Sequence, residues 1–273
     1  MSLARLKTIM IAALVLLNGF FLGIILTDRY ADTRSEQQAI DNVCAILYSN
    51  GIIISPGSIK STVAISTMRT AREVELEAAI AHAFLGIVDV PDQSVIYLYE
   101  NNERGIAEFF SAGDFLIQLH EGVITDGNDS LRTVRRLIED MKLETLTPVV
   151  TRDAEHETVS VVSAYRGVGI FNSTIDFVFS DGSLITVMGR YVSGVESADD
   201  GVGISNVSTA LLRFLAAVQR GEIECTEILS VEAGYHHSVV GSFGEGVIAP
   251  VWLITTAEVR YIIDSASGDI RQM

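Results

Sequence analysis

The stretch Phe179-Ser-Asp-Gly-Ser-Leu-Ile-Thr-Val-Met188 sets two apolar runs on either side of a polar turn that contains Gly. Such a turn between two runs predicts an antiparallel hairpin. A similar order of residues recurs in Phe110-Ser-Ala-Gly-Asp-Phe-Leu-Ile-Gln-Leu119, and the tail Ile263-Asp-Ser-Ala-Ser-Gly-Asp-Ile270 follows the same logic. These hairpins indicate a sheet that is built from local antiparallel pairs.

The recurrence of this hairpin has two interpretations. Tandem repetition of a small α+β unit would give two related lobes. Three ordinary hairpins would give the same pattern, because polar turns with Gly are common. We favour two related lobes, with a boundary at Pro148.

Apolar residues at helical spacing predict four helices outward from these hairpins. The predicted helices cover about 36–50, 74–85, 130–141 and 207–219. Thr33 with Glu36, and Thr70 with Glu73, have the spacing of capping boxes ahead of the first two. Further strands are predicted at 51–55, 63–67, 94–99, 106–110, 115–119, 158–165, 173–179, 183–188, 223–233, 249–255 and 259–264. The fold class expected is therefore α+β, with antiparallel sheet and packed helices.

Composition restricts the partners of the chain. The 273 residues carry a net charge of −16 and are 48% hydrophobic, so the chain can bury a core while its surface is acidic. An acidic surface repels nucleic acid and favours a protein partner or simple solubility. Cys44 and Cys225 are the only cysteines. They are compatible with two separate buried thiols, which we favour, or with one long-range disulfide.

The N-terminus contains an uncharged run from Thr8 to Thr27, preceded by Arg5 and Lys7. Its length suits a helix that crosses a bilayer. A cleaved signal peptide is the alternative, but its apolar core is usually shorter and ends in a small-residue cleavage site. We therefore expect an uncleaved single-pass anchor in the cell membrane, with a cytoplasmic N-terminus and an extracytoplasmic bulk.

Small and polar residues within this run suggest a helix contact. Gly19 and Gly23 form a G-x-x-x-G pair, and Asn18 adjoins the same stripe. Small residues let two helices approach closely in lipid, and a buried amide gains from a partner on another helix. Gly is also simply common in membrane helices. Asn18, Gly19 and Gly23 are the candidate contact residues.

Motifs for catalysis are missing from the sequence. The adjacent His236 and His237 would point to opposite faces of a strand, which does not suit one metal ion. There is no H-E-x-x-H, C-x-x-C or G-x-S-x-G motif. We therefore expect no metal, no cofactor and no enzymatic activity.

Three groups of short motifs run through the chain in order. They are Arg5-Leu-Lys-Thr-Ile-Met-Ile11 with Leu17-Asn18; Tyr165-Arg-Gly-Val-Gly-Ile-Phe171 with Phe177-Val-Phe-Ser-Asp-Gly-Ser-Leu184 and Gly189-Arg-Tyr191; and Gly234-Tyr235 with Pro250-Val-Trp-Leu-Ile-Thr-Thr256 and Tyr261-Ile-Ile-Asp-Ser-Ala-Ser-Gly-Asp-Ile270. Together they resemble the YycH/YycI regulatory family of Gram-positive bacteria, closest to YycI. The last segment is also similar to a PepSY strand pair.

The resemblance implies a non-enzymatic accessory protein. Members of this family contact the sensor kinase WalK, largely through membrane helices, and tune signalling to cell-wall genes. It implies a sensor histidine kinase and a paralogous accessory protein as partners, and it carries over the anchor with Asn18. Trp252, Tyr235 and Gly268 match the family's C-terminal pattern and are expected to be structural.

These inferences divide the chain into four parts. They are a cytoplasmic tail over 1–7, an anchor over 8–27, a first lobe over 28–147 and a second lobe over 148–273 with PepSY-like C-terminal strands. The function expected is a membrane-anchored regulator of a sensor histidine kinase that controls cell-wall metabolism. The alternative is a PepSY-like extracytoplasmic module that inhibits a protease or senses a cell-wall ligand.

Overall fold

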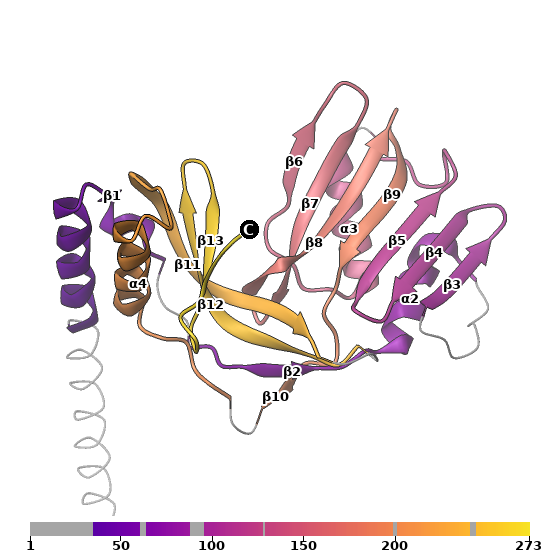
Figure 1. Cartoon of the computed structure of the whole chain (residues 1–273). Helices are drawn as coiled ribbons and strands as arrows, with labels where there is room; N and C mark the ends of the chain where they lie inside the picture. The colour runs from indigo at the N-terminus through magenta and orange to yellow at the C-terminus, as the bar shows by residue number, and fades with distance from the viewer. Residues whose placement is uncertain (1–34, 61–63, 88–95, 128, 199–200, 241–243) are drawn as a thin grey trace, which may run out of the picture. The chain divides into compact units, whose positions relative to one another are not determined.

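A computed structural model describes residues 35–60, 64–87, 96–127, 129–198, 201–240 and 244–273 (Figure 1). These residues contain four α-helices and a mixed sheet of 14 strands, so the α+β class is confirmed. The described residues form two compact units. The smaller unit takes the described part of Met1–Ser58 together with Val207–Ile228, and the larger takes Ile59–Asn206 and Leu229–Met273.

The predicted anchor from Thr8 to Thr27 lies outside the described residues. Among the residues that are described, no helix combines the length and apolar character needed to cross a membrane. The anchor therefore stays a prediction from the sequence.

The smaller unit contains two helices that follow their predicted positions. One covers 35–49, and the other is α4 (Val207–Gln219). Each buries one apolar stripe, with Leu47 and Phe214 fully inaccessible to solvent. The short strand β1 (Ile53–Ile54) comes next and is followed by the 3-10 helix η1 (Pro56–Ser58). β1 runs parallel to the first residues of β11 (Glu227–Val239).

The larger unit contains a run of seven antiparallel strands. In spatial order they are β6 (Val149–Arg152), β7 (Glu157–Tyr165), β8 (Val168–Ser180), β9 (Ser183–Arg190), β5 (Asp114–Leu119), β4 (Gly105–Phe110) and β3 (Ile96–Asn101). The two similar hairpins of the sequence are confirmed as β4–β5 and β8–β9, and they adjoin each other because β5 pairs with β9. Gly113 and Gly182 take positive φ angles of 83° and 75° in their turns, a conformation that glycine adopts at little cost.

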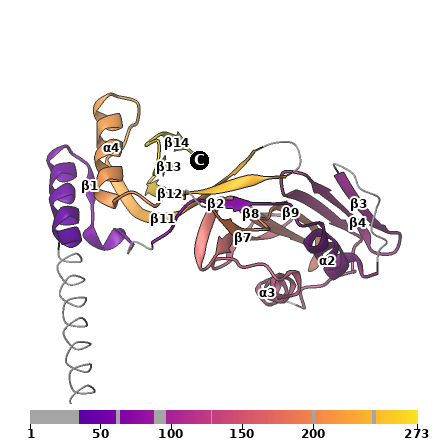
Figure 2. The same ribbon diagram turned by 90° about the horizontal axis from the view of Figure 1, so that it is seen from below.

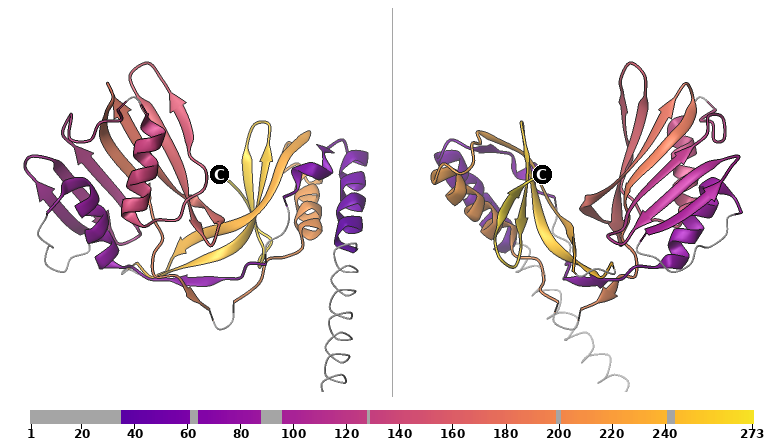
Figure 3. Two further views of the ribbon diagram at one scale, coloured as in Figure 1. Left: turned by 180° about the vertical axis from the view of Figure 1, so that it is seen from behind. Right: turned by 45° about the vertical axis from the view of Figure 1, so that its right-hand side comes forward.

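Helices α2 (Val74–Leu85) and α3 (Ser130–Met141) lie on one face of these seven strands (Figures 2 and 3). Alternate strand residues point toward the helices and form the core. The aromatic centre of that core consists of Tyr99, Phe109, Phe115 and Tyr191. We call the helix-covered side the inner face and the other side the outer face.

The remaining strands join this run through β8. They are β10 (Glu196–Ser197), β2 (Met68–Thr70), β12 (Gly246–Thr256), β13 (Arg260–Asp264) and β14 (Ile270–Gln272). The order is β10-β2-β12-β11-β8, with β13 and β14 extending from β12. β11 pairs with β8 in parallel, so the sheet is mixed where a purely antiparallel one was expected.

A side chain reinforces the parallel contact between β8 and β11. The backbone register pairs Tyr235 with Ile170. Two residues along β8, the Asn172 amide donates to the carbonyl of His237, and the backbone N–H of His237 donates to the Asn172 side chain, both at 2.8 Å. The Asn172 side chain therefore makes the two hydrogen bonds that a backbone neighbour would make.

The residues expected to be structural at the C-terminus are buried or in turns as predicted. Trp252 is fully buried in β12, and its indole N–H donates to the carbonyl of Ser205 at 2.9 Å. Tyr235 is buried, and Gly268 turns the chain between β13 and β14 with φ at 78°. A buried Trp needs a hydrogen-bond acceptor, and Ser205 supplies it.

A predicted helix cap was wrong, and the strand β6 was missed. Thr70 does not cap α2; it ends β2 and pairs with Gly246, while the N-cap position is Glu73, which makes no side-chain cap bond. β6 was not predicted, because its residues are mostly exposed and lack an apolar alternation. Pairing with a distant strand overrides the local signal in the first case.

Candidate functional site

The candidate contact residues of the sequence, Asn18, Gly19 and Gly23, lie outside the described residues. The four-part division of the chain likewise stays a prediction. The described residues contain three other places where side chains converge: a buried ion pair beneath α2, an acidic hollow beside β6, and the outer face of the seven-stranded run.

The ion pair joins Arg72, in the segment that leads into α2, to Glu77, in the first turn of that helix. The Arg72 guanidinium donates two hydrogen bonds, at 2.6 Å and 2.9 Å, to the carboxylate of Glu77, which is fully buried. The hydroxyl of Tyr191 donates to the same carboxylate at 2.6 Å, from 114 residues away in the chain. The Tyr97 ring lies 4.7 Å from the Arg72 guanidinium carbon. A buried carboxylate tolerates burial when it is paired and hydrogen-bonded in this way.

Burial dominates the electrostatics of this network. It raises the pKa of Tyr191, and the neighbouring Glu77 charge raises it further. Burial, again followed by Glu77, raises the pKa of Tyr99 to about 12. At neutral pH both phenols are protonated, so Tyr191 acts as a hydrogen-bond donor. Neither phenol is therefore poised to exchange a proton near pH 7.

His237 adjoins this network from β11. Its Nε2 lies 3.2 Å from the Thr70 hydroxyl, and burial, followed by the nearby Arg190 guanidinium, lowers its pKa to about 4. Gly246 is required beside this pair, since an added Cβ would lie 2.7 Å from both His237 Nε2 and Thr70 Oγ1. The imidazole is therefore neutral under physiological conditions.

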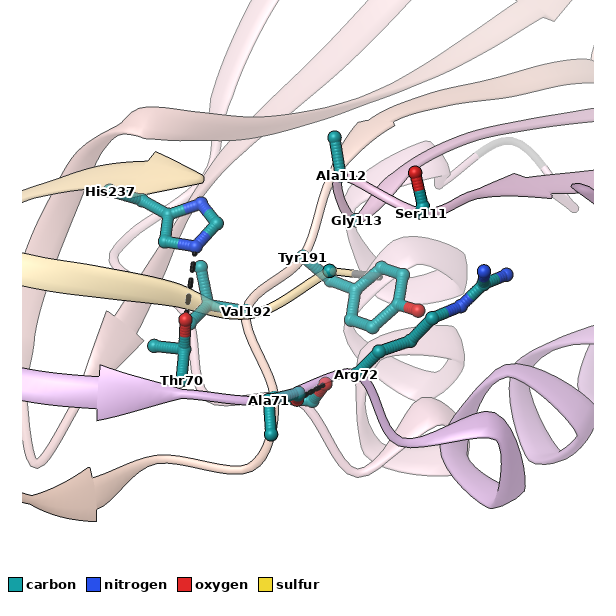
Figure 4. A pocket seen from close by; sticks show the side chains of 11 residues that line it. Thr70, Ala71, Arg72, Ser111, Ala112, Gly113, Tyr191, Val192 and His237 are labelled. Atoms are coloured by element: carbon teal, nitrogen blue, oxygen red, sulfur yellow. Dashed lines mark hydrogen bonds between the residues drawn. The ribbon is translucent and has the colours of Figure 1, made fainter. Parts of the chain in front are cut away.

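A small cavity separates these groups (Figure 4). Its walls include Arg72, Tyr191, Thr70 and His237, and its volume is about 10 Å³. A volume of this size holds at most one water molecule. The cavity is thus too small for an organic substrate, and the ion pair is a structural feature of the core.

The acidic hollow beside β6 is larger, at about 230 Å³. Two of its five carboxylates are held by neighbours: Glu157 accepts from Arg152 at 2.5 Å and from Ser130, and Asp153 accepts backbone N–H groups at 2.8 Å and 2.9 Å. The hydrogen bond from Ser130, followed by that from Arg152, lowers the pKa of Glu157. Within the described ranges, no three His, Cys, Asp or Glu residues are placed to hold a metal ion.

Cys44 and Cys225 are both free thiols, so they form no disulfide with each other. Cys44 is buried and Cys225 is half-buried. Burial raises the pKa of each thiol, which lowers its reactivity.

The outer face of the seven strands is a broad surface of the larger unit. Both helices that the structure describes in this unit lie on the inner face (Figure 2). One row of directly paired residues crosses all seven strands. The row reads Leu98, Glu108, Leu116, Met188, Asp176, Ser160 and Val149. At a strand spacing of about 4.8 Å it extends roughly 29 Å.

Large apolar side chains gather on this face. Leu98, Met188 and Val149 are 48%, 41% and 63% exposed, and Ile96 is 47% exposed. Phe110, opposite Ile96 on the neighbouring strand, is half-buried. Several exposed large apolar residues on one sheet face, even where polar residues separate them, make that face a candidate interaction surface.

Sequence reasoning missed the buried Glu77 and the outer face. Glu77 precedes Ile80, Ala81 and Phe84 by three, four and seven positions, so it shares their helical face. That spacing was a usable signal for burial. The outer face had a weaker signal, since its apolar residues are interrupted by Glu and Asp.

Comparison with known proteins gives a fold and no family. No family model and no curated protein matches the chain. Among solved structures, an uncharacterized protein from Eubacterium rectale is similar with a TM-score of 0.51 and 11% identity, over 77% of this chain and 86% of that one. The Bacillus megaterium YpeB C-terminal domain aligns over 75% of this chain and 99% of that domain, with 12% identity and a TM-score of 0.37. The chain therefore shares its α+β fold with a protein of unknown function.

Proposed function

We propose that this protein is a non-enzymatic, membrane-anchored regulator whose exterior part binds another protein. The observation that supports the proposal is the outer face, where a seven-stranded sheet presents apolar side chains opposite its helix-covered side. A sheet face of this width suits recognition of a macromolecule better than of a small molecule, which needs a concave pocket.

The partner in this proposal is a sensor histidine kinase that controls cell-wall metabolism, with a paralogous accessory protein as a second partner. Support comes from the sequence: the resemblance to the YycH/YycI family, the uncharged run from Thr8 to Thr27 and the contact residues Asn18, Gly19 and Gly23. In the proposal the N-terminus is cytoplasmic and the two related lobes are extracytoplasmic.

Crosslinking of the full-length protein in its native membrane, followed by mass spectrometry, tests the partner. We expect a sensor histidine kinase among the crosslinked products. Replacing Gly19 and Gly23 with Ile, or Asn18 with Leu, should weaken its co-purification and leave the exterior part folded. Unchanged association in these variants would refute a contact through the membrane helix.

The alternative function is a PepSY-like binding module that inhibits a protease or senses a cell-wall ligand. It is favoured by the C-terminal hairpin of β13 and β14, whose segment resembles a PepSY strand pair. The two functions differ in their need for the anchor. A chain that begins at Asp28 lacks the anchor. It should still inhibit the protease or bind the cell-wall ligand if the alternative holds, and it should lose kinase regulation if the leading proposal holds.

A further inference from the structure

The outer face carries unpaired negative charge beside its apolar residues. Glu108 and Asp176 belong to the row that crosses the sheet, and Glu100 lies beside Leu98 on β3. Arg190 and Asp114 also lie on this face but neutralise each other through two hydrogen bonds of 2.8 Å. In the part of the chain that the structure describes, Glu100, Glu108 and Asp176 form no ion pair with Lys or Arg. Asp176 accepts one hydrogen bond, from the Ser160 hydroxyl at 2.6 Å.

The arrangement of these groups defines the chemistry of a partner. Leu98, Leu116 and Met188 occupy every position of the row between β3 and β9 except that of Glu108. Asp176 follows Met188 on the next strand. Three apolar side chains with one carboxylate among them and another beside them are complementary to a segment that carries both apolar residues and Lys or Arg.

A second copy of this chain is a poor occupant. Two copies that met face to face around a two-fold axis would present the same surface to each other. Both copies would then bring the carboxylates of Glu100, Glu108 and Asp176 to the interface, and like charges across an interface oppose association. The net charge of −16 adds to this repulsion.

We propose that the outer face binds a cationic amphipathic helix of a partner protein, which would lie on the sheet as α2 and α3 do on the inner face. Its apolar residues at helical spacing would contact Leu98, Leu116 and Met188, and its Lys or Arg residues would pair with Glu108 and Asp176. This inference deepens the proposed function, since it names the chemistry of the segment that the exterior part recognises.

The test uses the full chain in phosphatidylcholine nanodiscs and two labelled 18-residue helical probe peptides. Both peptides carry the same Leu stripe, and their polar positions are all Lys in one and all Glu in the other. Fluorescence anisotropy measures binding, with empty nanodiscs as the reference. We expect the Lys peptide to bind the chain at least about tenfold more tightly than the Glu peptide or the empty nanodiscs.

Variants assign the binding to the outer face. Replacing Leu116 and Met188 with Ser should weaken the binding of the Lys peptide by about tenfold or more. E108Q/D176N should weaken it by about fivefold, because two ion pairs are lost. The matched control E139Q/D140N removes two exposed charges from α3 and should change binding less than about twofold. Urea denaturation, monitored by the fluorescence of Trp252, should give unchanged midpoints, which would show that the variants are folded.

Three results would overturn the inference. Equal weakening by E139Q/D140N and E108Q/D176N would show that the peptide binds the general negative charge of the protein. A dimer in analytical ultracentrifugation that Leu116→Ser/Met188→Ser dissolves would identify a second copy as the occupant. If the Lys peptide fails to bind while a kinase is still crosslinked in native membranes, the inference fails and the proposed function stands.

Discussion

Replacing Glu77 with Leu is expected to destabilise the larger unit severely. The carboxylate is fully buried and accepts three hydrogen bonds, two from Arg72 and one from Tyr191. The variant leaves the Arg72 guanidinium, whose side chain is only 10% exposed, without its carboxylate. Breaking a buried pair by removing one partner costs about 3–5 kcal/mol.

A triple variant isolates the cause. Replacing Arg72 with Met, Glu77 with Leu and Tyr191 with Phe removes the charges and the hydroxyl together. Replacing a complete buried ionic network with apolar groups of similar size is often neutral. We therefore expect the triple variant to regain most of the free energy of unfolding that Glu77→Leu loses.

Urea denaturation of the full-length chain measures both effects. Trp252 is the only Trp and is buried in the same unit, so its fluorescence reports unfolding there. With a slope of about 2 kcal/mol per M, a loss of about 4 kcal/mol lowers the midpoint by roughly 2 M. A loss below about 1 kcal/mol in Glu77→Leu, or a triple variant as unstable as the single one, would refute the reasoning. Glu139→Gln on the exposed side of α3 is the control and should leave the midpoint unchanged.

Three further variants test other parts of the larger unit. The pKa of His237 is lowered from 6.5 to about 4 in the folded chain, so between these pH values the unfolded chain binds a proton that the folded chain does not. The free energy of unfolding should therefore fall by about 3 kcal/mol as pH drops from 7 to 4. Urea midpoints of His237→Gln should lack this part of the pH dependence. Gly189→Ala places a Cβ 2.1 Å from the carbonyl oxygen of Thr174 at a φ of 153°, and a thermal melt should show a loss of about 3 kcal/mol or more. Trp252→Phe removes the hydrogen bond to Ser205 and should cost about 2 kcal/mol by circular dichroism, whereas a cost near zero would show that this bond is dispensable.

Local signals in the sequence explain most of the secondary structure. The hairpin turns at Gly113 and Gly182, and the start of α3 at Asp129, whose side chain accepts from the Arg132 N–H, depend on neighbours within a few residues. Residue propensity and spacing are therefore sufficient to predict such features. The predicted helices at 74–85, 130–141 and 207–219 match α2, α3 and α4 for the same reason.

Long-range pairing explains what the sequence did not reveal. Thr70 has the spacing of a capping residue, yet it belongs to β2 because Gly246 pairs with it from 176 residues further along the chain. The parallel contact between β8 and β11 and the approach of Tyr191 to Glu77 also join distant segments. The outer face arises in the same way, because strands from both halves of the chain form its rows.

The side chain of Asn172 has a consequence for producing the protein in other hosts. It belongs to the sequence Asn172-Ser-Thr174, which eukaryotic secretory pathways modify with a glycan on the amide nitrogen. In the folded chain that nitrogen donates to the carbonyl of His237 and joins β8 to β11. A glycan attached before folding would occupy the place of β11. Secretion from yeast or mammalian cells should therefore divide the product into a glycosylated form that cannot close its sheet and an unmodified form that can.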